Sequence, residues 1–233
     1  MNYSKKTDHL DIHIDESAKT ITIRQRWKYE WRYDSLNGIT NWTAAEKQDF
    51  HKKVLSLITS IWQGAPRIHL KGDSDFVKRN AYNSFKFRFD IQQVDSNEHW
   101  TVLANKISST ARLTSTVNWS TRRIVLDTND TVPTRKTNGL AIELQIPVAH
   151  EFGHTIGNIP YLYQGSHGDE YNSNLTFDLG AGIAQSITNF KDSQSIMNIG
   201  SFIRQRHFDY LLRELNTIIP GTIFYFNVLI RWN

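Results

Sequence analysis

The stretch AHEFGHTIG, from Ala149 to Gly157, carries two histidines four positions apart with a glutamate directly after the first. On an α-helix, residues i and i+4 share one face, so His150 and His154 can both point an imidazole nitrogen at one metal ion. Glu151 lies about 100° around the helix, where its carboxylate can reach a water on that ion without ligating the ion. The pattern predicts metal-assisted hydrolysis, in which Glu151 takes a proton from the water and later delivers it to the leaving amine.

The alternative interpretation is that both histidines are incidental, one buried and hydrogen-bonded and the other on the surface. The flanking residues favour metal binding. The apolar run before His150 suits a helix that forms the floor of a cleft, and Gly153 is small. Gly157 stands where a helix must stop sharply for the chain to turn back towards the metal.

Length and composition predict one folded domain over residues 1–233, because 39% of the residues are hydrophobic and 12% are aromatic. We expect an N-terminal lobe of sheet and helix at about 1–140, followed by the active-site helix and a C-terminal part at about 141–233. There is no cysteine, which excludes disulfides and thiolate ligands. Any metal must therefore be held by nitrogen and oxygen atoms, and zinc is the metal expected for this motif.

Charge and hydropathy limit the partners that can be expected. The formal net charge is +4, with both signs mixed along the chain. Aromatic and basic residues alternate in 21–33, and strict alternation places them on opposite faces of a strand, so we expect no nucleic-acid partner. We expect no membrane span, because no apolar run approaches about 18 residues, and no N-terminal signal peptide, because no apolar region follows Lys5 and Lys6.

Hydrophobic periodicity predicts an α+β fold with a mixed or antiparallel sheet. The sequence TAAE at 43–46 is a capping box and predicts the start of a helix that ends before the glycine and proline of 63–66. The other expected elements are strands at 21–33, 67–70, 85–91, 101–107 and 122–128 in one sheet, a turn-rich connection at 131–139, the motif helix ending at Gly157, a loop-rich stretch at 158–205, a helix at 207–215 and a strand at 222–232.

The motif helix and the later sequence SIMN, at 195–198, resemble the metzincin-like zinc metallopeptidases. In that family the active-site helix is followed by a methionine-containing turn, the Met-turn, beneath the metal. The resemblance makes Met197 the candidate Met-turn residue, with an ordinary core methionine as the alternative. The family's third ligand would fall at Pro160, which has no group that can coordinate, so another residue must complete the site.

The sequences HEFGH, GDEY at 168–171 and RQRHF at 204–208 are similar to bacterial toxin-type domains. These are effector domains of type VI secretion spike proteins and of related contractile injection systems, and the resemblance covers about residues 145–215. It implies that an insertion has moved the acidic ligand later in the chain. We therefore expect Asp169 as the third zinc ligand, with His167 and Glu170 as alternatives, and Asp178, Glu214 or a water as the remaining possibilities.

The tyrosine that some metzincin-like sites place just after the Met-turn is missing, because Asn198 and Ile199 stand there. Arg204, His207 and Tyr171 are candidates to stabilise the oxyanion of the tetrahedral intermediate. For Arg204 and His207, a structural role such as helix capping or a salt bridge is the favoured interpretation.

The leading hypothesis is a zinc-dependent endopeptidase with Glu151 as the general base. By resemblance it would be a secreted or delivered bacterial effector that acts, for example, in the periplasm of a target cell. Its partners would be a protein or peptide substrate and an immunity protein. Two alternatives stay open at this point: a zinc hydrolase that cleaves peptidoglycan, and a degenerate binding domain that has lost a working third ligand.

Overall fold

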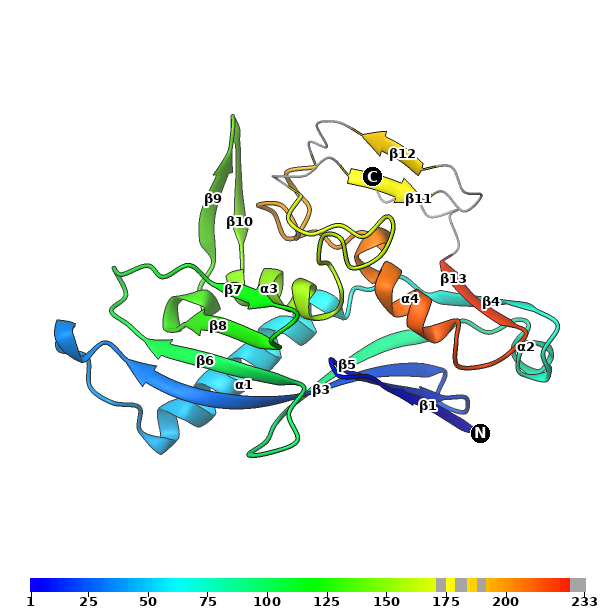
Figure 1. The fold of residues 1–233 in the computed structure, drawn as a ribbon, viewed down its shortest axis with the longest axis horizontal. Helices are drawn as coiled ribbons and strands as arrows, with labels where there is room; N and C mark the ends of the chain where they lie inside the picture. The colour runs from blue at the N-terminus through cyan, green and yellow to red at the C-terminus, as the bar shows by residue number, and fades with distance from the viewer. Residues whose placement is uncertain (171–174, 179–183, 188–191, 227–233) are drawn as a thin grey trace.

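The computed structural model describes residues 1–170, 175–178, 184–187 and 192–226, which form a mixed α+β fold (Figure 1). In chain order the strands and helices are β1 (Asn2–Lys6), β2 (Asp11–Asp15), β3 (Thr20–Tyr33), α1 (Ala44–Trp62), β4 (Ile68–Gly72), α2 (Asp75–Asn80), β5 (Lys86–Gln93), β6 (Trp100–Lys106), β7 (Thr116–Asn118), β8 (Arg123–Asp127), β9 (Thr134–Asn138), β10 (Ala141–Gln145), α3 (Pro147–Thr155), β11 (Leu175–Asp178), β12 (Ala184–Ile187), α4 (Asp209–Leu215) and β13 (Thr222–Phe226).

A seven-stranded mixed sheet is the frame of the molecule. Its longest strand, β3, pairs antiparallel with β2, parallel with β5 along its first half and parallel with β6 along its second half. Strand β8 continues the parallel part beside β6, and β7 closes this side of the sheet in antiparallel pairing with β8. The expected α+β class and mixed sheet are therefore confirmed, and β7 is an edge strand among the described residues.

Helix α1 covers one face of this sheet and crosses behind it in Figure 1. The predicted capping box is present: Thr43 accepts from the Glu46 amide, and Glu46 accepts from the Thr43 amide. The helix buries one side chain per turn, and it contacts both α3 and strand β5 of the sheet. These side chains are Phe50, Val54, Ile58 and Trp62.

Helix α3, which carries the histidines, packs against both α1 and the sheet. Pro147 occupies its first turn, where a missing backbone N–H costs nothing. Near the start of the helix, the Trp62 indole N–H donates to Ala149 O at 3.0 Å. At its end, the Gln25 amide of β3 donates to Thr155 O at 2.9 Å. Both ends of the helix are thus fixed by buried side chains from other elements.

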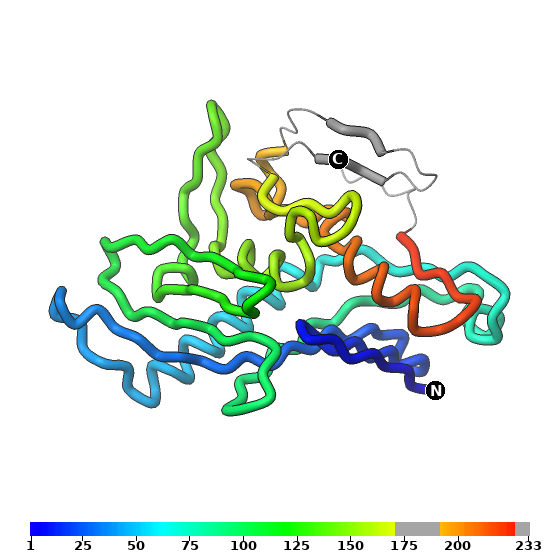
Figure 2. Tube along the Cα trace, viewed as in Figure 1, coloured from blue at the N-terminus to red at the C-terminus, as the bar shows by residue number. Residues whose placement is uncertain are grey.

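Several expected elements differ from the structure. The segment expected as a strand at 67–70 leaves the main sheet, because β4 pairs antiparallel with β13 instead. The segment expected as a turn-rich connection at 131–139 contains β9, which forms with β10 a hairpin that projects from the body of the molecule (Figures 1 and 2). Its polar, turn-rich composition misled the prediction, because an exposed hairpin buries little and needs few apolar residues.

The ends of three elements also differ from expectation. Helix α3 ends at Thr155 rather than Gly157, and Gly157 follows in a left-handed conformation with φ +103°. Helix α4 begins at Asp209, after a short 3-10 turn at 205–208. The final strand is confirmed up to Phe226, and 227–232 lie outside the described residues. Within the described part of the chain, every helix is too short or too polar to cross a bilayer.

Gly153 in α3 allows Met197 to pack against the helix. A Cβ placed at Gly153 would lie 2.3 Å from Met197 Sδ and 3.2 Å from the Trp62 ring, both of which are fully buried. The helix can therefore approach the turn that carries Met197 only because position 153 has no side chain.

Replacing Gly153 with alanine should lower the free energy of unfolding by about 1 to 3 kcal/mol, although alanine is the better helix former. The reason is overpacking against Met197 and Trp62. Chemical denaturation of the two proteins measures the difference. Gly64→Ala is the matched control, since a Cβ there meets only Ile61 O at an ordinary 3.6 Å, and an equal loss in the control would contradict the packing argument.

Candidate metal centre

Three side chains from two segments converge at one point beside α3. The Nε2 atoms of His150 and His154 lie 3.1 Å and 3.2 Å from the same carboxylate oxygen, Asp169 Oδ1. The two imidazole rings are 5.0 Å apart and nearly perpendicular. The structure therefore brings the two predicted histidines together with Asp169, the residue expected as the third ligand.

Hydrogen bonds at the far side of each ring fix the tautomers. His150 Nδ1 lies 2.6 Å from Ile196 O, and His154 Nδ1 lies 2.7 Å from Asn158 O. A carbonyl oxygen can only accept, so each Nδ1 must carry the proton and donate it. In the neutral rings, both Nε2 atoms then present lone pairs towards Asp169, as metal-ligating histidines do.

The convergence of these three acceptors requires a positive charge between them. Two imidazole lone pairs and a carboxylate oxygen repel one another unless a cation or a proton lies among them. Ligands at about 2.0 to 2.2 Å from a tetrahedral zinc ion are separated from each other by roughly 3.3 Å, close to the 3.1 Å and 3.2 Å observed. The donor set, its spacing and its tautomers thus fit a zinc ion.

The pKa shifts of Asp169 and His154 also indicate that these groups need positive charge between them. Burial by itself would raise the pKa of Asp169, but hydrogen bonds with His150 and His154 hold it well below its usual value. Burial would lower the pKa of His154, yet Asp169 and the nearby charge of Glu151 raise it above its ordinary value. The pocket therefore favours a carboxylate together with positive charge, supplied by protons when no metal is bound.

The chain after α3 is folded back so that Asp169 can reach the histidines. At Gly157, a Cβ would lie 2.3 Å from Tyr210 Cβ, so the turn needs glycine for space as well as for its positive φ. Pro160, which stands where the family pattern has a ligand, packs against Gly168, where a Cβ would lie 2.4 Å from Pro160 Cδ. Pro160 thus supports the residue directly before Asp169.

The turn that contains Met197 connects the two ligand-bearing segments. Ile196 O accepts from His150, and Met197 O accepts from the Glu170 amide at 2.8 Å. The buried Gln145 amide donates to three carbonyl groups of this turn, those of Ile196, Asn198 and Gly200, at 2.7 to 3.1 Å. Gln145 therefore stiffens the turn that orients one histidine and holds the Asp169 loop.

Glu151 lies at the border of two cavities. The first is a cleft of about 850 Å³ whose lining includes both histidines, Asp169 and the whole of β7. The second, of about 510 Å³, lies under the β9–β10 hairpin and shares His150 and Glu151 with the first. Glu151 is thus beside the candidate metal position and open to both cavities, as a residue that handles a water molecule must be.

Sequence reasoning missed Asp130, a buried carboxyl that lines the second cavity. Its pKa is raised to about 7, mainly by burial and in smaller part by the charges of Asp127 and Glu151. Hydrogen bonds from the Asp127 amide and the Ser115 hydroxyl lower the pKa, but by less. It sits in a 3-10 turn that no periodic pattern marks. Only an Asp placed three residues after another Asp, as in a capping box, hints at this turn.

His167 and Glu170, the alternative ligands, belong to a separate buried cluster with His207. His207 Nδ1 accepts from the Arg204 amide at 3.0 Å, so its proton is on Nε2 and points to Glu170 at 3.1 Å. Both Glu170 oxygens also accept from Arg206 at 2.7 Å. Because the His207 atom that faces the cluster is a donor and Glu170 is already paired with a cation, this group is a polar network and not a second metal centre.

The remaining candidates lie away from the histidines or outside the description. Glu214 pairs with Lys5 at 2.6 Å. Arg204 forms a two-pronged ion pair with Asp192, and His207 is fully buried, so the favoured structural interpretation suits both of them better than oxyanion binding. Tyr171 and the Asp178 side chain lie outside the described residues.

Removing the Asp169 carboxylate should lower zinc affinity by more than about 100-fold, because losing a ligand must cost more than losing a residue that supports one. Asp169→Ala, compared with the wild-type chain by competition with a chromogenic chelator, measures this. Asp95→Ala, at an exposed position, is the control and should leave the affinity unchanged. Equal zinc affinity in Asp169→Ala and wild type would exclude Asp169 as a ligand.

Comparisons with known proteins gave no further identification. No protein-family model, no curated protein and no solved structure matches this chain.

Proposed function

We propose that this chain is a zinc-dependent peptidase with a metzincin-like site. The observation that carries the proposal is the meeting of His150 Nε2, His154 Nε2 and Asp169 Oδ1 beside Glu151 in an open cleft. The three ligating residues would hold the ion, and the open side of the cleft leaves room for water and substrate. The position of Asp169 favours this proposal over a degenerate domain, because a carboxylate from the returning loop would take the place of the ligand that Pro160 cannot supply.

When bound, zinc would supply a Lewis acid that polarises the scissile carbonyl and makes a water molecule more acidic. Glu151 would act as the general base: its carboxylate accepts the proton of the attacking water and then passes it to the amine that leaves. His150 and His154 stay neutral donors of their Nε2 lone pairs, because Ile196 O and Asn158 O retain their Nδ1 protons.

The cleft favours an extended peptide as substrate. Its wall is β7, which pairs only with β8 among the described residues and so leaves one backbone edge unpaired. An extended peptide can add to such an edge through main-chain hydrogen bonds, which recognise the backbone rather than a particular side chain. This edge lines the same cleft as the candidate metal ligands, so a bound peptide bond would lie near the water that Glu151 serves.

The likeness to metzincins is supported by Met197, buried beneath α3, and by the sharp turn at Gly157. The third ligand departs from the family pattern, since it would come from the loop that ends at Asp169. Delivery as a bacterial effector remains a prediction from the toxin-type resemblance. Peptidoglycan cross-links contain peptide bonds as well, and the choice between protein and peptidoglycan is a matter for the substrate test.

Glu151→Ala should lower the rate of peptide hydrolysis about 100- to 10,000-fold, the usual contribution of a general base, while zinc content stays near that of wild type. Zinc-loaded wild type and variant are incubated with a denatured protein mixture and with purified sacculi, and new amino termini are counted in each. The control is Glu98→Ala, a glutamate that pairs with Lys28 and lines neither cavity.

If Glu151→Ala still hydrolysed peptide bonds at the wild-type rate, Glu151 could not be the residue that activates the water. Cleavage of sacculi alone would assign peptidoglycan as the substrate, and cleavage of proteins alone would assign proteins. A zinc-loaded wild type that releases no amino termini from either material would contradict the proposed activity.

A further inference from the structure

Glu170 faces away from the candidate metal centre, although it directly follows Asp169. The Asp169 carboxylate points to the two histidines, whereas the Glu170 carboxylate points into the protein and has a side-chain exposure of 0%. A buried carboxylate is costly unless it is paired and hydrogen-bonded. Its partners therefore show what keeps this part of the loop in place.

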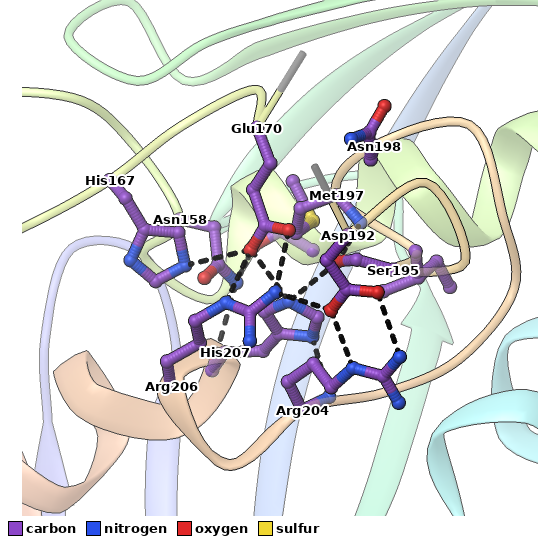
Figure 3. A network of polar contacts seen from close by, with 12 residues as sticks. Asn158, His167, Glu170, Asp192, Ser195, Met197, Asn198, Arg204, Arg206 and His207 are labelled. Carbon is purple, nitrogen blue, oxygen red and sulfur yellow. Dashed lines mark hydrogen bonds and ion pairs between the residues drawn. The ribbon is translucent and has the colours of Figure 1, made fainter. Parts of the chain in front are cut away.

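The partners of Glu170 form a network in which positive and negative charges balance (Figure 3). Arg206 binds both carboxylate oxygens at 2.7 Å, and its Nη2 also reaches Asp192 at 2.9 Å. Asp192 in turn is paired with Arg204. Two carboxylates and two guanidinium groups thus offset each other, and the fork-shaped arginine contacts fix direction as well as distance.

His207 adds a neutral donor to the same carboxylate. Burial keeps its pKa below the ordinary value, and its Nε2–H points to Glu170 Oε1 at 3.1 Å. The same Nε2–H lies 3.2 Å from the Ser195 hydroxyl, and this hydroxyl accepts from the Met197 amide at 3.2 Å. Glu170 is therefore linked to the Met197 turn through side chains.

The backbone of Glu170 makes a second link to that turn. Its N–H donates to Met197 O at 2.8 Å, and the preceding carbonyl, Ile196 O, accepts from the His150 ring at 2.6 Å. Successive carbonyl groups of one turn therefore hold the ligand His150 and the residue directly after the ligand Asp169. The third candidate ligand is joined to the network as well, because Asn158, whose carbonyl accepts from His154, donates its side-chain amide to His207 O at 3.1 Å.

From these contacts we propose that Glu170 is a positioning residue for the metal centre: its ion pair with Arg206 and its hydrogen bond from His207 fix the loop that presents Asp169 to the histidines. This inference depends on the proposed metal site and adds to it. The sequences DEY and RQRH then have one physical explanation. The first contains the ligand Asp169 and its neighbour Glu170, and the second contains Arg206 and His207, which bind the Glu170 carboxylate.

The test is the zinc affinity of Glu170→Gln, measured by chelator competition with the folded protein. Glutamine keeps the size and one acceptor oxygen but loses the charge that Arg206 requires. Affinity should fall about 10- to 100-fold, as for other residues that support metal ligands. The visible absorption of the cobalt(II)-loaded protein should also change, because a displaced carboxylate alters the coordination geometry.

Glu16→Gln is the matched control. Glu16 is also a buried carboxylate held by an arginine fork and an amide, with Arg79 at 2.8 Å and 3.3 Å and Asn80 at 3.0 Å, but it follows β2 and lines neither cavity beside the histidines. This variant should lose thermal stability with zinc affinity and cobalt spectrum unchanged. A purely structural role for Glu170 would give the same result in Glu170→Gln and would overturn the proposal.

Arg206→Lys provides a second variant should Glu170→Gln fail to fold. Lysine keeps the positive charge but loses the two-pronged geometry, so zinc affinity should fall less, about 3- to 10-fold, with cobalt absorption shifted in the same direction. An affinity equal to wild type in this folded variant would overturn the proposal. If wild type itself binds no zinc, the proposed function fails together with this inference; if wild type binds zinc and the variants bind it equally well, only this inference fails.

Discussion

Three acceptor atoms that repel one another meet beside α3. Asp169 Oδ1 lies at about a ligand-to-ligand distance from the Nε2 atoms of both His150 and His154, and a cation between the three groups would change their repulsion into attraction. Hydrogen bonds from each Nδ1 to a backbone carbonyl prevent the rings from relieving the conflict by exchanging tautomers.

Two different kinds of support meet at the site. The helix that carries the histidines is fixed by apolar packing and by side chains of the sheet and α1, such as Gln25 and Trp62. The loop that carries Asp169 has no regular hydrogen-bonded structure and is fixed by polar contacts instead, through Glu170 and the turn around Met197. Buried ion pairs are seldom the most stable solution for a core. Their presence beside the ligands suits a site whose ligand side chains must point in fixed directions, because ion pairs and hydrogen bonds fix direction better than apolar packing does.

Local features of the fold were predictable from sequence, whereas contacts between distant segments were not. The capping box at Thr43 and the alternation in β3 were confirmed because each depends on residues close in the chain. The alternating apolar residues of β2, Ile12 and Ile14, could have marked a further strand, but the segment is short and polar at its ends. The pairing of β4 with β13 joins segments about 150 residues apart, and no local pattern records it.

The candidate site also has one part that was predictable from the sequence and one part that was not. The relation between His150, Glu151 and His154 follows from helix geometry alone. The choice among His167, Asp169 and Glu170 could not be made from their residue types, because neighbouring positions in a loop can face opposite directions. In the structure, contacts with Arg206 turn Glu170 into the protein, and the packing of Pro160 on Gly168 supports the loop in which Asp169 points to the histidines.

X-ray absorption spectroscopy at the zinc edge, on wild-type protein loaded with one equivalent of zinc, tests the proposed metal centre most directly. We expect two imidazole nitrogens at about 2.0 to 2.1 Å and at least one carboxylate oxygen at about 2.0 to 2.2 Å, with the rest of the shell made of water. A spectrum with three or more imidazoles, or with fewer than two, would contradict the centre described here.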